Sequence, residues 1–503
     1  MVILIRAKKA LKMSLLLTDQ QVQEFLINGY LILRPSSLDD DFHSTIFTEA
    51  LTIYEKEGNL GNNILPRIPR LQQVFDDPVI KGGIQSLLGE NYTMQPHRHP
   101  HLTSPGTKDQ MWHKDSYFGF AKMLRHHQTR YLMAMYYPQD TTREMGPTGI
   151  KPRTQYDAIN PKKYRGPKTF ENTNAKNDPK IDMFATCTAG TVILIHYDLV
   201  HRGSANISSN SHRFMFKFQF NRLDEPTKPT WNHDPANANY DAADAGLLQP
   251  VVKHVWNWLL GNDKPIEQTY TVDDINRWKS LLDNPDGKVR LNANYNLALC
   301  NEYETLIERL YHEVEILRLE ASYALTACRH NRDAIMKLQD VLRKEKNNES
   351  IAFCIAFIFF EMGPIASDAL PLLINIVQKR DSWLLQQYCC EALGTIQSND
   401  EDIQNQAVHC LIHILSKRDE QHNLIGKSHM RLTAALSLAR LGPKAAQAIP
   451  ELKQALYNDS NRYVNANALL ALERIGTVEA LKVAFDYLKM SRWCAKTTKD
   501  STF

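Results

Sequence analysis

The sequence predicts a multidomain protein with a β-rich N-terminal half and an all-helical C-terminal half. Short β-like runs separated by Pro, Gly, Asn and Asp extend from about residue 92 to 222, which is typical of a sandwich, barrel or jelly roll. From about residue 270 the apolar positions take a helical period and blocks of sequence repeat, which predicts an α-solenoid. The 503 residues are enough for about three domains.

The composition is that of an ordinary globular chain, with 43% hydrophobic and 23% charged residues. No wholly apolar run approaches the ~20 residues of a membrane helix, so we expect no membrane span. The formal net charge of +3 comes from 59 basic and 56 acidic residues, and four of the basic ones lie in the first twelve positions. The remainder is close to neutral, which gives no case for nucleic-acid binding. Eight cysteines without a CxxC pair indicate buried thiols in a reducing compartment, and we expect a cytoplasmic protein.

The first domain should open with a helix, a turn and a strand. Thr18 and Gln21 have the spacing of a capping box, and Gly29 can end the helix in a left-handed conformation. A strand is expected at residues 30–33 and a second helix around residues 42–51. Further strands are expected at residues 131–137, 191–195 and 214–220, and one more helix at 251–260. We place this domain at residues 14–262, after a basic N-terminal extension at 1–13.

Two sequence blocks recur in the C-terminal half. Leu291–Asn294 returns as Val464–Asn467, and the segment that begins Gly363-Pro364 returns at Gly442-Pro443. Helix pairs of this kind stack, because one pair alone cannot bury its apolar face. The units resemble short HEAT-like repeats of the bilin-lyase type, which we expect over residues 263–487, with a C-terminal tail at 488–503. Because solenoids mostly bind other molecules, a protein partner or self-association is expected through this domain.

Three groups of histidines compete as metal sites. They are His113 with Asp115; His196 with Asp198 and the following His201; and His97, His99 and His101. Alternate residues of a strand share one face, so a His-x-Asp pair plus a distant histidine can form the two-His-one-carboxylate triad of non-haem iron(II) oxygenases. Three imidazoles would suit zinc, but Pro100 argues against a regular central strand there. Arg213, twelve residues after His201, could pair with a dicarboxylate through its planar guanidinium.

Four segments occur in order between about residues 16 and 222. They are Leu17–Leu33 with its Thr18, Gln21, Phe25 and Gly29 spacing; Trp112-His113-x-Asp115; Gly146-Pro147; and Gly190-Thr191-Val192 leading to His201 and Arg213. In this combination the chain resembles the phytanoyl-CoA dioxygenase superfamily of iron(II)/2-oxoglutarate-dependent oxygenases. The resemblance implies a double-stranded β-helix, the jelly-roll or cupin-like fold, with flanking helices.

The same resemblance implies roles for single residues. His113, Asp115 and His201 become the iron ligands, Arg213 becomes the 2-oxoglutarate anchor, and His196 falls at a position that does not bind metal. Gln95 and Arg98 lie 18 and 15 residues before His113, where relatives place pocket residues, and are candidates for substrate binding. Related halogenases replace the carboxylate with Ala or Gly, so Asp115 favours a hydroxylase, a desaturase or a related oxidase. The segment 151–155 departs from the family's usual Pro-Gly-Ser-His, so the resemblance does not imply a substrate.

The expected function is therefore that of a dioxygenase that uses iron(II), 2-oxoglutarate and O2. We expect it to oxidise, by hydroxylation, an unactivated carbon of a small organic metabolite while 2-oxoglutarate is decarboxylated to succinate. A second hypothesis is that it hydroxylates a protein or carrier-bound substrate that the HEAT-like repeats recruit. A third is a non-enzymatic scaffold, against which the intact set of metal-binding residue types argues.

Overall fold

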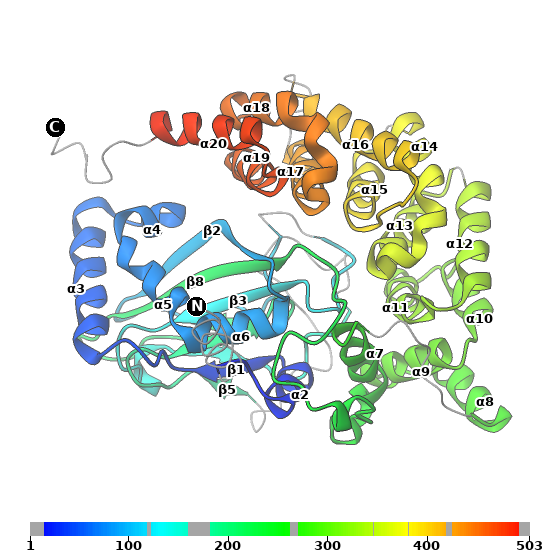
Figure 1. Ribbon diagram of the computed structural model, residues 1–503. Helices are drawn as coiled ribbons and strands as arrows, with labels where there is room; N and C mark the ends of the chain where they lie inside the picture. Colours follow the sequence, from blue (N-terminus) through cyan, green and yellow to red (C-terminus); the bar gives the residue numbers. More distant parts are fainter. Residues whose placement is uncertain are drawn as a thin grey trace. The chain divides into compact units, whose positions relative to one another are not determined.

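The computed structural model describes residues 15–117, 122–158, 182–261, 270–345, 347–380, 382–418 and 425–491. The chain divides into two compact units, residues 1–262 and 263–503. The first unit contains strands and helices, whereas the described residues of the second form helices and no strand (Figure 1). The predicted basic extension at 1–13 lies outside the described residues, as does the predicted tail beyond Ser491.

The N-terminal unit is built on two antiparallel sheets. The larger has the order β1-β6-β3-β8-β2, formed by Tyr30–Leu33, Val192–His196, Tyr131–Tyr136, Arg213–Arg222 and Tyr92–Thr103. The smaller has the order β5-β4-β7, formed by Met183–Phe184, Thr148–Ile150 and His201–Gly203. Strands far apart in the sequence pair throughout, always antiparallel, as expected for a jelly roll. The predicted fold class is confirmed.

Strand β8 shows how alternation in the sequence creates a core and a functional face. Phenylalanines occupy alternate positions from 214 to 220, and this face packs on helix α5 (Gln72–Asp76), where the rings of Phe75 and Phe218 have centroids 4.4 Å apart. The opposite face carries Arg213, Met215 and Lys217 into the interior of the domain. The face opposite the phenylalanines therefore offers the polar side chains of Arg213 and Lys217, which can contribute to a functional site.

Strand β2 lies at the edge of the larger sheet, which is where a strand with Pro96 and Pro100 can be accommodated. Its register with β8 shifts between Met94 and Arg98, so a bulge separates the two halves of the strand. The expectation that Pro100 excludes a central strand is confirmed.

The predicted opening of the domain is also confirmed. Helix α2 (Asp19–Asn28) begins with the Thr18–Gln21 capping box and ends at Gly29 with a φ of 81°. A side chain at Gly29 would also collide with Leu199, because its Cβ would lie 2.7 Å from Cδ1 of that residue. The other α-helices among the described residues of this unit are α3 (Asp40–Glu57), α4 (Ile64–Arg67), α6 (Pro78–Leu88) and α7 (Gln249–Leu259).

The C-terminal unit is a row of stacked helix pairs that follows an arc (Figure 1). Every second helix from α9 to α19 packs on the next, which is the arrangement of HEAT-like repeats. The recurrent segments Gly363–Ala369 and Gly442–Ala448 both form 3-10 turns that lead into the second helix of a pair. The α-helices are α8 (Val272–Leu281), α9 (Gly287–Leu299), α10 (Tyr303–Arg309), α11 (Glu315–Leu325), α12 (Arg332–Lys344), α13 (Glu349–Met362), α14 (Leu370–Lys379), α15 (Trp383–Thr395), α16 (Glu401–Ser416), α17 (Ile425–Leu441), α18 (Ile449–Asn458), α19 (Arg462–Ile475) and α20 (Val478–Ser491). Helix α20 continues the array past the predicted end at residue 487.

One helical segment, Glu349–Lys379, is long and apolar enough by length and composition to cross a membrane. The most apolar window of this segment is 78% buried inside the unit, and Gly363-Pro364 interrupts the segment with a 3-10 turn. It therefore forms the apolar centre of the helical array. The uninterrupted apolar run Ile351–Phe360 within it is ten residues long, which is about half the length of a membrane helix.

Candidate metal centre

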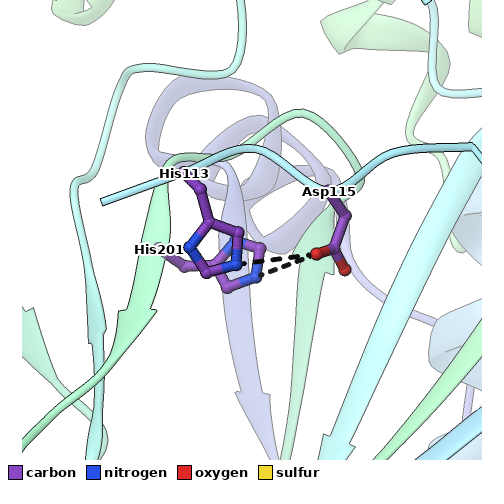
Figure 2. A group of neighbouring side chains, drawn as sticks. All are labelled: His113, Asp115 and His201. Carbon is purple, nitrogen blue, oxygen red and sulfur yellow. Dashed lines mark ion pairs between the residues drawn. The ribbon is translucent and has the colours of Figure 1, made fainter. Parts of the chain in front are cut away.

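Two backbone hydrogen bonds bring His113 and His201 together. His113 lies in the connection between β2 and β3, and His201 opens β7; each amide donates to the other's carbonyl at 3.0 Å. Residues paired in this way project their side chains to the same side, and the two imidazole centroids are 4.6 Å apart. Asp115, two residues after His113, turns its carboxylate toward both rings (Figure 2).

The three side chains have the geometry of a metal site. Oδ1 of Asp115 lies 3.6 Å from Nε2 of His113 and 3.9 Å from Nε2 of His201. In each histidine Nδ1 is bound to a backbone carbonyl, Met111 O at 2.8 Å and Leu199 O at 2.9 Å, so Nε2 is left as the free ligand atom. The possible ligand atoms all lie within 4.8 Å of one another, and in the described part of the chain no other group of three does. The residues therefore fit a divalent transition metal.

The electrostatics keep these ligands in the protonation states that metals require. Burial alone would raise the pKa of Asp115, but the nearby Lys217, His201 and His113 hold it well below the usual range. Burial, with His113 adding to it, lowers the pKa of His201 to about 4. At neutral pH the site therefore offers an ionised carboxylate and a neutral imidazole, which is what a metal ion binds.

A small cavity of about 100 Å³ lies against the two histidines. Arg213 lines it from β8 and is only 1% exposed. Its Nε donates at 3.1 Å to the carbonyl of Gly146, which Nη2 also contacts, while Nη1 has no hydrogen-bond partner in the described part of the chain. The other cations on this cavity are Lys108, Arg202 and Lys217, and no carboxylate is among its described lining residues. Because Lys217 is paired with Asp115 and Arg202 lies 3.6 Å from Asp109, Arg213 is the buried cation best placed to bind an anion here.

The competing His-x-Asp pair is part of the core. Asp198 is fully buried, and its carboxylate accepts hydrogen bonds from Arg125 Nη1 and Tyr117 Oη, both at 2.7 Å. Burial lowers the pKa of His196 to about 4. Both oxygens of Asp198 are already occupied by protein donors, so this pair stabilises the fold.

The third histidine group lies on β2. The rings of His99 and His101 lie against each other in a tilted arrangement with centroids 4.2 Å apart, and His101 lines the cavity. His99 contacts Asn59 at 3.3 Å, and burial is the main cause that lowers the pKa of both histidines. Within the described ranges these residues line the interior beside the metal site and do not form a second cluster of three ligands.

The two predicted substrate residues are not among the described residues that line the cavity. Gln95 is buried and its amide contacts Oδ1 of Asn221, while the backbone of Arg98 donates to Asn62 at 3.1 Å. Their proposed role in substrate binding stays a prediction. Lys217, by contrast, was not singled out in the sequence and yet contacts Asp115 directly. The period-two alternation of β8 from Arg213 could have found it.

A His-Asp-His cluster beside a cationic cavity in a jelly roll is typical of non-haem iron(II) oxygenases that use 2-oxoglutarate. The family model described as phytanoyl-CoA dioxygenase (PhyH) matches residues 20–214, and the model for HEAT repeats matches residues 427–493. The N-terminal domain thus belongs to the phytanoyl-CoA dioxygenase family and is an iron(II)/2-oxoglutarate-dependent oxygenase, followed by HEAT-like repeats. No curated protein matches the chain.

Several solved structures are similar to part of the chain. The non-haem α-ketoglutarate-dependent carbocyclase SnoK from nogalamycin biosynthesis has 20% identity and a TM-score of 0.34, covering 41% of this chain and 85% of its own. HygX from Streptomyces hygroscopicus with iron bound has 14% identity and a TM-score of 0.31, covering 41% and 87%. EctD from S. alaskensis with 2-oxoglutarate and 5-hydroxyectoine has 17% identity and a TM-score of 0.34, covering 43% and 80%.

Proposed function

We propose that this protein hydroxylates an unactivated carbon of a small organic metabolite. The proposal rests on His113, Asp115 and His201, whose possible ligand atoms lie within 4.8 Å of one another beside a cavity that Arg213 lines. The cavity lining includes the buried Arg213 and the exposed Lys108, so a small molecule from solution could reach the cluster. In the overall reaction, substrate, 2-oxoglutarate and O2 become hydroxylated substrate, succinate and carbon dioxide.

Different residues of the chain would bind the metal and the cosubstrate. His113, Asp115 and His201 would hold iron(II), which together with 2-oxoglutarate supplies the activation of O2 and the oxidation of the C–H bond. Arg213 would bind the carboxylate of 2-oxoglutarate that lies away from the metal, using the guanidinium nitrogen that has no partner among the described residues. Because this arginine is buried and fixed on Gly146, it selects a dianionic cosubstrate of defined length.

A second candidate substrate is a protein or a carrier-bound molecule recruited by the helical repeats. The observation in favour is the HEAT-repeat match at residues 427–493 in an array that begins at α8. Repeat arrays offer extended surfaces for partner binding. In this case the solenoid would bind the partner, and only the reacting side chain or acyl group would enter the cavity.

One assay separates the two candidates. The full-length protein is incubated with iron(II), 2-oxoglutarate and ¹⁸O2, and succinate is measured with panels of small metabolites and of proteins from the same cells. We expect a small metabolite to stimulate succinate release and to gain one labelled oxygen atom, and Asp115→Ala to abolish both. Stimulation by protein or carrier fractions alone would overturn the small-molecule proposal. A product that has two hydrogens fewer than the substrate and no added oxygen would show that the reaction is desaturation and not hydroxylation.

A further inference from the structure

The two carboxylate oxygens of Asp115 have different partners. Oδ1 is the oxygen that faces both imidazole Nε2 atoms, at 3.6 and 3.9 Å. Oδ2 accepts a hydrogen bond from Nζ of Lys217 at 2.5 Å. One oxygen is thus turned to the metal site, and the other is held by a cation.

Lys217 is placed for this contact by its strand. It lies on β8 four residues after Arg213, on the same face, and pairs across the ladder with His99 of β2. Its side chain is 10% exposed and that of Asp115 is 14% exposed, so the ion pair is largely shielded from water. In the described part of the chain, Asp115 is the one side-chain hydrogen-bond partner of Lys217.

The number of coordination positions gives this contact its importance. A six-coordinate metal held by two histidines and one carboxylate oxygen keeps three positions, two for the chelating atoms of 2-oxoglutarate and one for O2. If both carboxylate oxygens bound the metal, two positions would remain, and 2-oxoglutarate would fill them. A carboxylate in a metal site can bind through one oxygen or two, so something must hold the second oxygen away.

We propose that Lys217 is a positioning residue that keeps Asp115 a one-oxygen ligand. By holding Oδ2, the lysine keeps open the metal position that O2 requires while 2-oxoglutarate is bound. This inference rests on the assignment of His113, Asp115 and His201 as the metal ligands. Outer-shell hydrogen bonds are known to fix the orientation of carboxylate and histidine ligands in this way.

The number of exchangeable waters on bound Mn(II) tests the proposal directly. The full-length protein is loaded with Mn(II), and water-proton relaxation is measured before and after saturation with 2-oxoglutarate, without O2. In the wild type we expect about three exchangeable waters, falling to about one with 2-oxoglutarate. In Lys217→Met we expect about two exchangeable waters, falling to none with 2-oxoglutarate. The water-proton relaxation should then drop to the value of a metal that is shielded from water.

Three further variants make the result specific. Lys151→Met removes another buried lysine that pairs with a carboxylate, Asp182 at 2.9 Å, and should behave as wild type. Lys217→Arg keeps a cationic donor and should retain the wild-type water numbers. The side chain of asparagine has a single oxygen that can bind a metal. The double variant Lys217→Met/Asp115→Asn should therefore regain the water-binding position on the metal that Lys217→Met loses.

Equal water numbers in Lys217→Met and wild type, with circular dichroism showing folded protein, would overturn the proposal. So would a loss in Lys217→Met that Asp115→Asn fails to reverse, because the second carboxylate oxygen would then not be the cause. A failure of the proposed function looks different. If wild-type protein does not bind Mn(II), or if His113→Ala binds it equally well, the metal centre itself is wrongly assigned.

Discussion

Replacing Arg213 by alanine tests the cosubstrate assignment on a single side chain. The guanidinium is buried on β8, its Nε is fixed on the carbonyl of Gly146 at 3.1 Å, and it lines the cavity that contains His113 and His201. The alanine variant removes the cation and its donors while leaving the three proposed metal ligands in place. Iron should therefore still bind, and the affinity for 2-oxoglutarate should fall.

The magnitude follows from the kind of hydrogen bond lost. A hydrogen bond to a charged group contributes about 1.5–3 kcal/mol, and every 1.4 kcal/mol is tenfold in affinity. We expect 2-oxoglutarate to bind roughly 10- to 150-fold more weakly to Arg213→Ala. Arg213→Lys keeps a positive charge but loses the planar pair of guanidinium donors. Its affinity for 2-oxoglutarate should therefore fall less than that of Arg213→Ala. Arg202, on the same cavity, is partly exposed and only 3.6 Å from Asp109, so Arg202→Ala should cost less than about threefold.

The assay is anaerobic titration of the iron-loaded full-length variants with 2-oxoglutarate, followed by calorimetry or by the absorption of the complex. Iron content is measured on the same samples, and circular dichroism checks the fold, because Arg213→Ala also frees the buried carbonyl of Gly146. If Arg213→Ala binds 2-oxoglutarate as tightly as wild type does, or loses no more affinity than Arg202→Ala does, Arg213 is not the residue that anchors 2-oxoglutarate.

Three other predictions concern the stability of the two units. Asp198→Asn should lower the free energy of unfolding by about 3–5 kcal/mol, because it removes the buried carboxylate charge that lies 2.7 Å from Arg125 Nη1, yet iron content should not change. Because burial lowers the pKa of His196 to about 4 from an ordinary 6.5, the folded state resists protonation, and stability should fall as the pH drops from 6.5 to 4. His196→Gln should remove up to about 3 kcal/mol of that fall in urea titrations across pH, whereas an unchanged pH profile would show that burial of His196 is not its cause. In the solenoid, Gly394→Ala would place a Cβ 2.6 Å from Cα of Ser437 and should destabilise the array by about 1–3 kcal/mol, which thermal unfolding would show and an unchanged transition would refute.

The grouping of His113, Asp115 and His201 could be predicted from the sequence, because one family motif connects all three. His113 and Asp115 are two residues apart, and their resemblance to a family motif identifies His201 as the third member. The family resemblance also separated this pair from His196 and Asp198, whose spacing is the same. The structural reason for that separation is Arg125, which neutralises Asp198 in the core and which no spacing in the sequence connects to it.

The substrate side of the cavity could not be predicted in the same way. Gln95 and Arg98 were chosen by their distance from His113 in the sequence, but the bulge between Met94 and Arg98 changes which face of β2 each residue occupies. Lys217 was missed for the opposite reason, because no motif includes it. Its importance comes from a contact between β8 and Asp115, a hundred residues apart, which only the tertiary structure shows.

The iron content of four purified proteins tests the assigned metal centre most directly. We predict one iron(II) per chain in the wild type and in His196→Ala, and almost none in His113→Ala and His201→Ala, with all four folded by circular dichroism. Anaerobic reconstitution followed by removal of loosely bound metal and elemental analysis gives these numbers directly. Iron that is retained in His113→Ala and lost in His196→Ala would contradict the assigned centre and the function proposed from it.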